Sequence, residues 1–402
     1  MKNNWRIVKI PDVLSFQEGP GVRKHQFTTE GVKLLNVGNI NDGQINLSKT
    51  KIFISEQEAY GKYKHFLADD GDLVIASSGI VVSNFHNKIA FIKKEHLPLC
   101  MNTSTIRFKE IDNKIIDINY FKYFLKTNLF SNQLRKLITG SAQLNFGPSH
   151  LKQIDLLLPP LDDQKRIVEL LDQADSLRQK RKQVIALLDE YLKSVFLDMF
   201  GNPMNNPNKW ELKKFGEIGK LDRGISKHRP RNATQLLGGN HPLIQTGDVS
   251  NSGIYIENYK STYSDLGLKQ SKKWPKGTLC ITIAANIAKT GILSFDACFP
   301  DSVVGFIADR KQTNNEFIHF WISFLQEMLE KNAPVSAQKN INLRILRELD
   351  VFMPPVELQN KFSNIVIKTE LIRKQMLAQT LELDNQFQAL MQKQFSQSTP
   401  VN

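Results

Sequence analysis

This sequence has few cysteines, no long apolar run and no recognisable leader segment. Its 402 residues include three cysteines, Cys100, Cys280 and Cys298, an odd number without metal-ligand spacing. No apolar stretch approaches the ~20 residues that a membrane helix needs, and Met1–Arg6 leads into no signal-peptide core. We therefore expect buried free thiols in a cytoplasmic protein that makes no membrane contact, with two to three domains.

Catalytic motifs are equally scarce. The segment 284–290 ends in Ala-Lys-Thr but lacks both glycines of a phosphate-binding loop. The eight histidines form no zinc-binding pattern. The strongest catalytic candidate is the string Asp301, Asp309 and Lys311, because two carboxylates and a lysine can hold a metal ion and activate water. A self-sufficient metal-dependent DNA nuclease is therefore one alternative function. A charged turn is the better explanation of these three residues.

The sequence instead contains a long internal repeat. Residues 141–145, Ser-Ala-Gln-Leu-Asn, recur as Ser-Ala-Gln-Lys-Asn at 336–340, an offset of 195. The same offset relates Pro159-Pro160 to Pro354-Pro355 and Gln164 to Gln359. A repeat of this length predicts two copies of one unit, a globular domain followed by a helix, related by an approximate two-fold axis.

The repeat continues weakly into the globular parts. Residues 37–40, Val-Gly-Asn-Ile, are similar to Thr-Gly-Asp-Val at 246–249, and Cys100 to Phe108 is similar to Cys298 to Phe306. The offset drifts along these matches, which places insertions in loops, where function usually varies. The predicted segments are a first globular domain at 1–150, spacer helix 1 at 151–202, a second globular domain at 203–345 and spacer helix 2 at 346–402.

Each globular domain is predicted to be α+β. Short β-rich runs dominate, and they are expected as strands at 73–76, 88–92, 105–108, 279–283 and 303–307. Each domain then has one amphipathic helix, at about 119–137 in the first and about 315–330 in the second. The whole chain is therefore predicted to be α+β with two similar domains separated by two long helices.

The positive charge is confined to the globular segments. Of the total net charge of +13, segments 1–150 and 203–345 carry +7 each, whereas the helical segments carry −1 and 0. This distribution indicates that each domain touches a polyanion while the helices only connect. An interaction protein whose basic faces bind an acidic protein or RNA remains an alternative.

The helical segments carry apolar residues at coiled-coil spacing. After each Pro-Pro pair these residues recur at steps of three, four or seven, which predicts two seams that pack antiparallel on each other and serve as a spacer. The seam and partner-docking candidates are Leu170, Leu177, Val184, Leu188, Val195, Ile365, Ile372, Leu383 and Leu390.

Polar and basic loops are the candidates for DNA contact. Arginine and lysine can clamp phosphates or read guanine, and asparagine and glutamine can read adenine. The candidates are Arg23, Lys24, Gln26, Ser77, Ser78, Asn84, Gln143 and Asn145 in the first half, and Arg223, Lys227, Arg229, Arg231, Asn286, Gln338 and Asn340 in the second. We expect no catalytic residue and no metal site in this chain.

One stretch resembles a known family. Gln143, Asn145, Leu158-Pro159-Pro160-Leu161, Gln164 and the helix that runs to Phe200-Gly201-Asn202-Pro203 resemble the specificity subunit of Type I restriction–modification enzymes. The second copy, from Gln338 to Phe395, matches more loosely, with Val356 in place of leucine. The order of domain, helix, domain, helix along the whole chain is also the order of that family.

The resemblance implies a non-catalytic subunit of an adenine-N6 DNA methyltransferase and restriction complex. Each domain would read one half of a bipartite double-stranded DNA site, and the helices would set the gap. Two methyltransferase subunits would dock on the helices and use S-adenosylmethionine, and restriction subunits would supply ATP- and Mg-dependent translocation and cleavage. A related two-subunit restriction system remains open as the parent complex.

Overall fold

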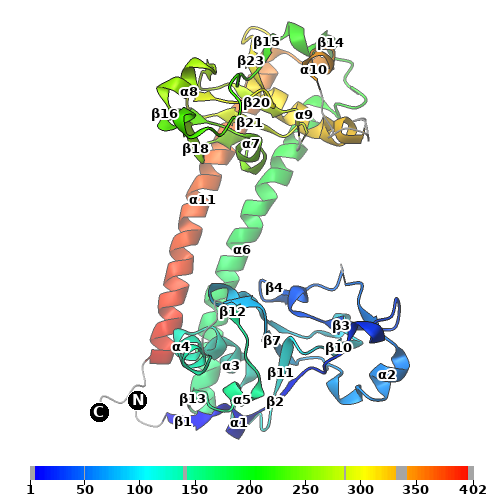
Figure 1. Cartoon of the computed structure of the whole chain (residues 1–402), viewed down its shortest axis with the longest axis vertical. Coiled ribbons are helices and arrows are strands. Elements are labelled where there is room, and N and C mark those ends of the chain that lie inside the picture. The colour runs from blue at the N-terminus through cyan, green and yellow to red at the C-terminus, as the bar shows by residue number, and fades with distance from the viewer. Residues whose placement is uncertain (1–4, 49, 139–142, 285–286, 332–341, 397–402) are drawn as a thin grey trace. The chain divides into compact units, whose positions relative to one another are not determined.

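The chain forms two compact units. The computed structural model describes residues 5–48, 50–138, 143–284, 287–331 and 342–396. The first unit consists of Met1–Lys180 with Thr380–Asn402, and the second is Arg181–Gln379. The division therefore falls inside two long helices, α6 (Leu161–Phe200) and α11 (Val356–Ser396), so that each unit contains a part of both (Figure 1). This grouping differs from the four consecutive segments that the sequence pattern predicts.

The first unit is built on two sheets. The main sheet has four antiparallel strands in the order β2 (Leu14–Glu18), β11 (Thr105–Glu110), β7 (Leu73–Ala76) and β9 (Ile89–Phe91). The second sheet has the order β10 (Leu99–Met101), β3 (Val32–Leu35) and β6 (Phe53–Ile54), with β10 and β3 parallel. A separate antiparallel pair joins β1 (Arg6–Lys9) to β13 (Asp155–Leu158), directly before α6.

The second unit repeats this plan. Its main sheet has the order β15 (Gly219–Arg223), β23 (Val303–Ala308), β20 (Leu279–Thr282), β21 (Thr290–Leu293) and β17 (Tyr255–Ile256). Its second sheet has the order β18 (Ser261–Tyr263), β16 (Leu237–Leu243), β22 (Ala297–Cys298) and β19 (Lys273–Trp274). The pair β14 (Glu211–Lys214) and β24 (Asp350–Met353) precedes α11 as β1 and β13 precede α6.

The two units therefore share a core topology, as the repeat predicts, and the second unit adds β17 to its main sheet and β19 to its second sheet. The parallel pair β3 and β10 corresponds to β16 and β22, and the cysteines Cys100 and Cys298 lie on these equivalent strands. All three cysteines are free and buried, as expected. Burial raises the pKa of the Cys100 thiol to about 12, so the group stays protonated and behaves as a small apolar side chain.

One predicted helix is wrong. The stretch expected as a single helix over 119–137 forms two, α3 (Ile118–Leu125) and α4 (Asn128–Leu137). Thr127 separates them, because its hydroxyl donates to Phe124 O and accepts from Phe130 N, which ends one helix and caps the next. The corresponding helix of the second unit, α9 (Asn315–Lys331), is continuous, as predicted.

A buried glutamine bonds each long helix to the loop before α3 or α9 and to the first proline of the preceding Pro-Pro pair. Gln164 Oε1 accepts from Asp117 N, and its Nε2 donates to Ile115 O and Pro159 O, at 2.8–2.9 Å. The repeat-related Gln359 accepts from Thr313 Oγ1 and donates to Gln312 O and Pro354 O. Both side chains are fully buried. The Pro-Pro-x-x-x-Gln pattern is therefore a structural device that fixes where each helix leaves its domain.

The two long helices run antiparallel. In the second unit Arg181 bonds to Gln379, Arg373 pairs with Asp189, and Phe200 packs on Phe362, so the two helices run in opposite directions there. In the first unit Arg178 pairs with Asp384. The offset of 195 relates Arg178 to Arg373 and Asp189 to Asp384, so each helix donates an arginine to an equivalent aspartate on the other. The predicted antiparallel arrangement is confirmed inside each unit.

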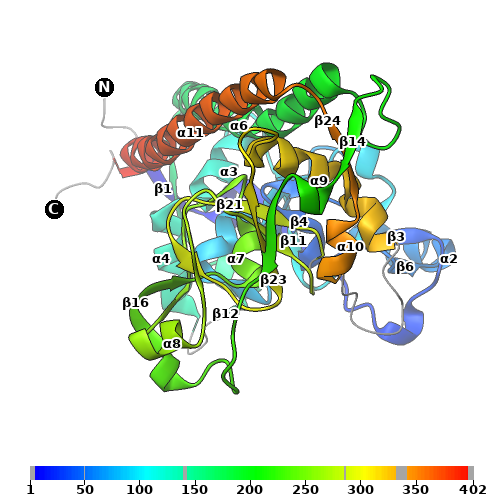
Figure 2. The same cartoon turned by 90° about the horizontal axis from the view of Figure 1, so that it is seen from above.

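The ends of these helices complete the domain cores. In the second unit Phe196 and Phe200 of α6 stack on Phe317 of α9, which lies between the main sheet and the helices (Figure 2). In the first unit Phe395 of α11 stacks on Tyr120 of α3, with ring centroids 5.0 Å apart. Gly201, at a φ of +82°, ends α6 in the left-handed conformation that glycine tolerates best.

The predicted seam is wrong at several positions. Leu170, Leu177, Val184 and Ile372 are 41, 60, 42 and 48% exposed. The buried positions of α6 are instead Ile167, Leu171, Leu192, Phe196 and Phe200. Of the remaining candidates, Val195, Ile365 and Leu390 are partly buried against the cores, and Leu188 and Leu383 are half-buried. The reason is that these isoleucine, leucine and phenylalanine side chains form the inward face of α6, which leaves the heptad stripe outside. None of the helices in the described ranges has the length and apolarity needed to cross a membrane.

We predict that Gln164→Ala lowers the free energy of unfolding by about 1–3 kcal/mol, because it leaves buried backbone groups of residues 115, 117 and 159 without partners. Gln173→Ala is the matched control, since its amide only contacts Glu169 on the exposed side of the same helix. Urea unfolding followed by circular dichroism measures both. Equal stability of the two variants would contradict the fastening role of Gln164.

Candidate nucleic-acid interface

The basic loop of the first unit presents two free cations. Arg23 and Lys24 are exposed, at the start of the short helix η1 (Lys24–Gln26), and have no carboxylate partner among the described residues. Gln26 has a different role. Its Nε2 donates to Glu58 Oε1 at 2.7 Å and to Tyr63 Oη at 3.0 Å, and its Oε1 accepts from Arg23 N. The amide of Gln26 thus holds the loop in shape, while Arg23 and Lys24 stay available to an anion.

The basic loop of the second unit is partly neutralised. Arg223 and Lys227 are exposed, but Arg231 pairs with Asp301 at 2.5 Å and Arg229 lies 3.6 Å from the same carboxylate. Arg229 also donates to Ser226 O and His228 O, at 2.6 and 2.9 Å. Arg229 and Arg231 therefore shape the loop, and Arg223 and Lys227 are its more accessible cations.

Residues 143–145 of the first Ser-Ala-Gln-x-Asn copy lie beside the turn that follows strand β7. The two-residue strands β8 (Ile80–Val81) and β12 (Gln143–Leu144) pair, and Asn145 Oδ1 accepts from Gly79 N at 2.9 Å. Ser77 is buried, whereas Ser78 is half-buried beside the exposed Gly79. The structure thus brings together the two stretches that the sequence marked separately. The described residues do not include Asn286, Gln338 and Asn340. For Asn84 and Gln143 the structure describes the backbone alone.

The acidic string gives no support to the nuclease alternative. Asp301 is paired with arginine, as described above. Asp309 accepts from Lys311 N at 3.1 Å and from Gln312 Nε2 at 2.9 Å, and these bonds lower the pKa of its carboxyl. Both acids therefore have local structural partners. In the parts of the chain that the structure describes, no group of three or more His, Cys, Asp or Glu side chains is arranged to hold a metal ion.

Each unit has an open polar cavity that the candidates missed. In the first unit the cavity measures about 610 Å³ and lies at η2 (Val37–Asn39) and the hairpin β4–β5 (Ile40–Asn41 and Gln44–Ile45). In the second it measures about 360 Å³ and lies at α7 (Thr246–Asn251) and the following turn. These places correspond to each other in the repeat, through Gly38-Asn39 and Gly247-Asp248. The weak similarity of 37–40 to 246–249 was the signal that could have found them.

The long helices offer a surface of a different kind. On α6 the side chains of Leu170, Leu177, Val184, Leu187 and Tyr191 are between 41 and 60% exposed. On α11 the exposed apolar side chains are Ile367, Leu371, Ile372, Leu377 and Leu381. Large apolar side chains gathered on long helices are characteristic of a surface that a protein partner covers.

Comparison with known proteins agrees with this architecture. The model of the Type I restriction modification DNA specificity domain matches twice, at residues 2–187 and 207–379. The two matches cover most of the chain and coincide with the internal repeat. The protein belongs to the family of Type I restriction-modification DNA specificity proteins, and it carries two copies of the domain.

Relatives span nearly the whole chain at low identity. The putative Type I restriction enzyme MjaX specificity subunit of Methanocaldococcus jannaschii is 21% identical over 89% of this chain and 84% of its own length. The EcoKI specificity subunit of Escherichia coli is 21% identical over 98% of this chain and 89% of its own length.

Solved structures share the fold. A chain described in a study of complex assembly and conformational transition of the type I R-M system superposes with a TM-score of 0.62 at 16% identity, over 98% of both chains. The Type I S subunit from M. genitalium gives 0.50 at 16% identity, over 98% of this chain and 96% of its own. The predicted α+β fold class and the family resemblance are both confirmed.

Proposed function

We propose that this chain is the DNA sequence-recognition subunit of a Type I restriction–modification complex, in which each globular domain reads one half of a bipartite site. The observation that carries the proposal is the duplication itself: the specificity-domain model matches twice, and each of the globular segments 1–150 and 203–345 holds a net charge of +7 while the helical segments hold −1 and 0. Excess positive charge on a reading domain attracts the DNA backbone and leaves base contacts to set the sequence. Its DNA ligand places the protein in the cytoplasm.

The partners in this proposal supply the chemistry. Two methyltransferase subunits would bind S-adenosylmethionine and modify adenine at N6, and restriction subunits would bind ATP and Mg. This chain would contribute recognition and position alone. A related two-subunit restriction system is the second possible parent complex, and the identity of the co-purifying subunits separates the two.

We predict that exchanging residues 14–110 for the same strands of another family member changes only one half of the recognised sequence. These bounds retain α3, α4 and the segment after them, because α3 contacts the end of α11 through Tyr120 and Phe395. The readout is genome-wide mapping of N6-methyladenine in cells that express the chimeric subunit with its methyltransferase. Exchange of residues 219–308 is the matched control and should change only the other half. Alteration of both halves by one exchange would contradict independent reading.

The proposal also assigns the helices a spacer role. Both helices are continuous, and the boundary between the units falls at Lys180/Arg181 in α6 and at Gln379/Thr380 in α11. Insertions at these two points leave the ion pairs Arg178–Asp384 and Arg373–Asp189 intact within their own units.

We expect four residues inserted at both points to lengthen the gap between half-sites by one to two base pairs. Four helical residues add about 6 Å, and a base pair rises ~3.4 Å. Seven residues, which nearly restore the helical phase, should add about three base pairs. The methylated motif of each variant gives the gap directly. A gap that stays constant in an active seven-residue variant would remove the spacer role.

The exposed apolar stripe of α6 is the proposed docking surface for the methyltransferase. We predict that Leu177→Asp reduces co-purification of that subunit at least tenfold, because a charge replaces an apolar side chain that docking would bury. The side chain is 60% exposed in the chain alone, so the fold should be unaffected. Gln179→Asp, an exposed polar position on the same helix, is the matched control. Normal assembly of the Leu177→Asp variant would place the docking surface elsewhere.

A further inference from the structure

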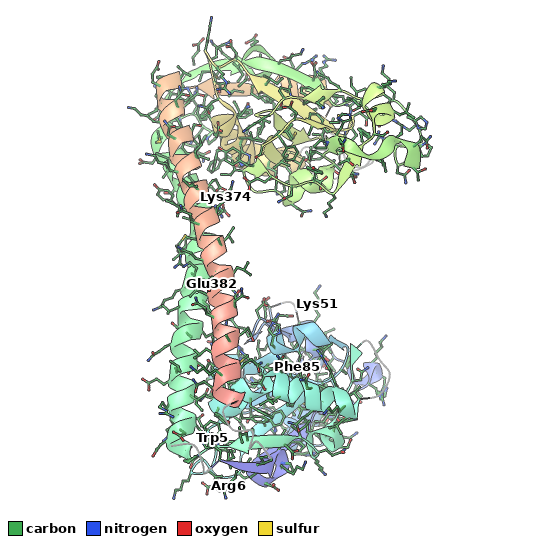
Figure 3. The ribbon with its side chains drawn as sticks, turned by 90° about the vertical axis from the view of Figure 1, so that its left-hand side faces the viewer. Trp5, Arg6, Lys51, Phe85, Lys374 and Glu382 are labelled. Atoms are coloured by element: carbon green, nitrogen blue, oxygen red, sulfur yellow. The ribbon has the colours of Figure 1, made fainter. Side chains whose placement is uncertain are left out.

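The cavity beside the β4–β5 hairpin, here called the hairpin cavity, is lined mainly by amides. Its polar side chains are those of Asn36, Asn39, Asn41, Asn46, Thr50 and Lys51. None of these lining side chains is acidic. Figure 3 shows Lys51 at the edge of the first globular domain that lies away from Trp5 and Arg6. A concave, polar and acid-free surface on a basic DNA-reading domain is suited to an electron-rich ligand.

The floor of the hairpin cavity is held rigidly. Asn39 Nδ2 donates to Asn46 O at 3.1 Å and to Thr50 Oγ1 at 2.6 Å, and its Oδ1 accepts from Asn36 N. Asn41 Nδ2 donates to Gly38 O at 2.7 Å. These bonds tie the turn before the hairpin to the loop after it. A floor fixed in this way presents its remaining groups in a defined geometry, as selective recognition requires.

A lysine adds fixed positive charge beneath the hairpin. Lys88 Nζ donates to Ile40 O and Asn41 Oδ1, both at 2.7 Å, and to Val37 O at 3.2 Å. Its three bonds all go to neutral oxygens, so in the described part of the chain no carboxylate neutralises it. The ammonium therefore both holds the hairpin in place and makes the cavity attractive to acceptor atoms.

The groups left free in the hairpin cavity are hydrogen-bond donors. Asn46 Oδ1 is occupied, because it accepts from Ser48 N at 3.0 Å and Ser48 Oγ at 2.7 Å. This fixes the amide so that Nδ2 faces away from the turn, and that Nδ2 has no partner among the described residues. Lys51 Nζ is likewise exposed and has none. Asn46 Nδ2 and Lys51 Nζ are therefore two donors that can bind a ligand, whereas the acceptor Asn46 Oδ1 is already occupied. Two such donors match a base edge that offers two acceptors.

The equivalent cavity of the second unit has a different lining. It includes the acidic residues Asp248 and Glu257 beside Asn251 and Lys260, and Glu257 is paired with Lys374. Asp248 uses Oδ2 to accept from Gln245 N, and Asn251 donates its Nδ2 to Gly247 O, which leaves their other oxygens unengaged by any described residue. A shared position with contrasting chemistry is what two domains need if they read different bases. A purely structural cavity gives no reason for the contrast.

We propose that the hairpin cavity reads a guanine in the half-site bound by the first domain, with Asn46 Nδ2 and Lys51 Nζ donating to its O6 and N7. Guanine alone presents two adjacent acceptors in the major groove, whereas adenine pairs an acceptor with a donor. This inference rests on the proposed function, because it assumes that the first domain binds a DNA half-site.

The test compares Asn46→Asp, Lys51→Gln and wild type as full chains bound to their methyltransferase subunits. Asn46→Asp keeps the oxygen that Ser48 requires and removes the donors, so the turn should persist. Affinity is measured for duplexes in which each base pair of the methylated motif is replaced in turn. We expect wild type to discriminate against loss of one guanine in the first half-site roughly 5- to 150-fold. Both variants should lose most of that discrimination and keep the second half-site unchanged.

Lys94→Gln is the matched control, since it removes an equally exposed lysine of the same domain that does not line the hairpin cavity. It should leave base discrimination unchanged. A uniform loss of affinity for all duplexes in the Asn46 and Lys51 variants would mean a phosphate contact and would overturn guanine reading. So would a first half-site without a discriminated guanine. A wild-type complex without sequence preference at either half-site would instead overturn the proposed function.

Discussion

The packing of each long helix into the core of a second domain is the constraint on which this structure depends. The helix α6 is bonded to the first domain through the buried side chain of Gln164 near its start. It ends with Phe196 and Phe200 inside the core of the second domain. The helix α11 is bonded to the second domain through Gln359 and ends with Phe395 against Tyr120 in the first core. Burial of these aromatic rings contributes more than the surface ion pairs beside them. The ion pairs Arg178–Asp384 and Arg373–Asp189 add direction and register.

The repeat made most of the architecture predictable from sequence. Strands at 73–76 and 279–283 were expected from their apolar, β-branched composition, and the structure places them at the centres of equivalent sheets. The Pro-Pro pairs gave the starts of both long helices, because proline favours the first turn and ends what precedes it. The break at Thr127 was missed, because the apolar spacing continues through it and only the hydroxyl bonds of that residue reveal the cap.

The seam was misassigned for a physical reason. The heptad of Leu170, Leu177, Val184 and Tyr191 has ideal spacing, so periodicity alone selects it. The inward face instead carries charged side chains between its apolar ones, as at Arg178, whose guanidinium stacks over the Phe387 ring at 4.3 Å. The apolar periodicity of this face is interrupted in the sequence, because arginine counts as a polar residue. In a folded structure the apolar stem of an arginine can pack against neighbours while its charged tip forms an ion pair. Candidate loops were located better than candidate residues. The sequence marked Arg23, Lys24 and Gln26 together as contact candidates, yet only the structure separates Gln26, which is internally bonded, from Arg23 and Lys24.

The discontinuity of the first unit has a consequence for the order in which the protein is made. The second unit is one uninterrupted stretch, Arg181–Gln379, whereas the first needs residues from both ends of the chain. Phe387, Met391 and Phe395 belong to the core of the first unit, although they are made after the whole of the second unit. Domains generally fold from the N-terminus onward during synthesis. Here the second unit can close first, and the first unit remains open along one side of its core until the residues that follow the second unit have been made.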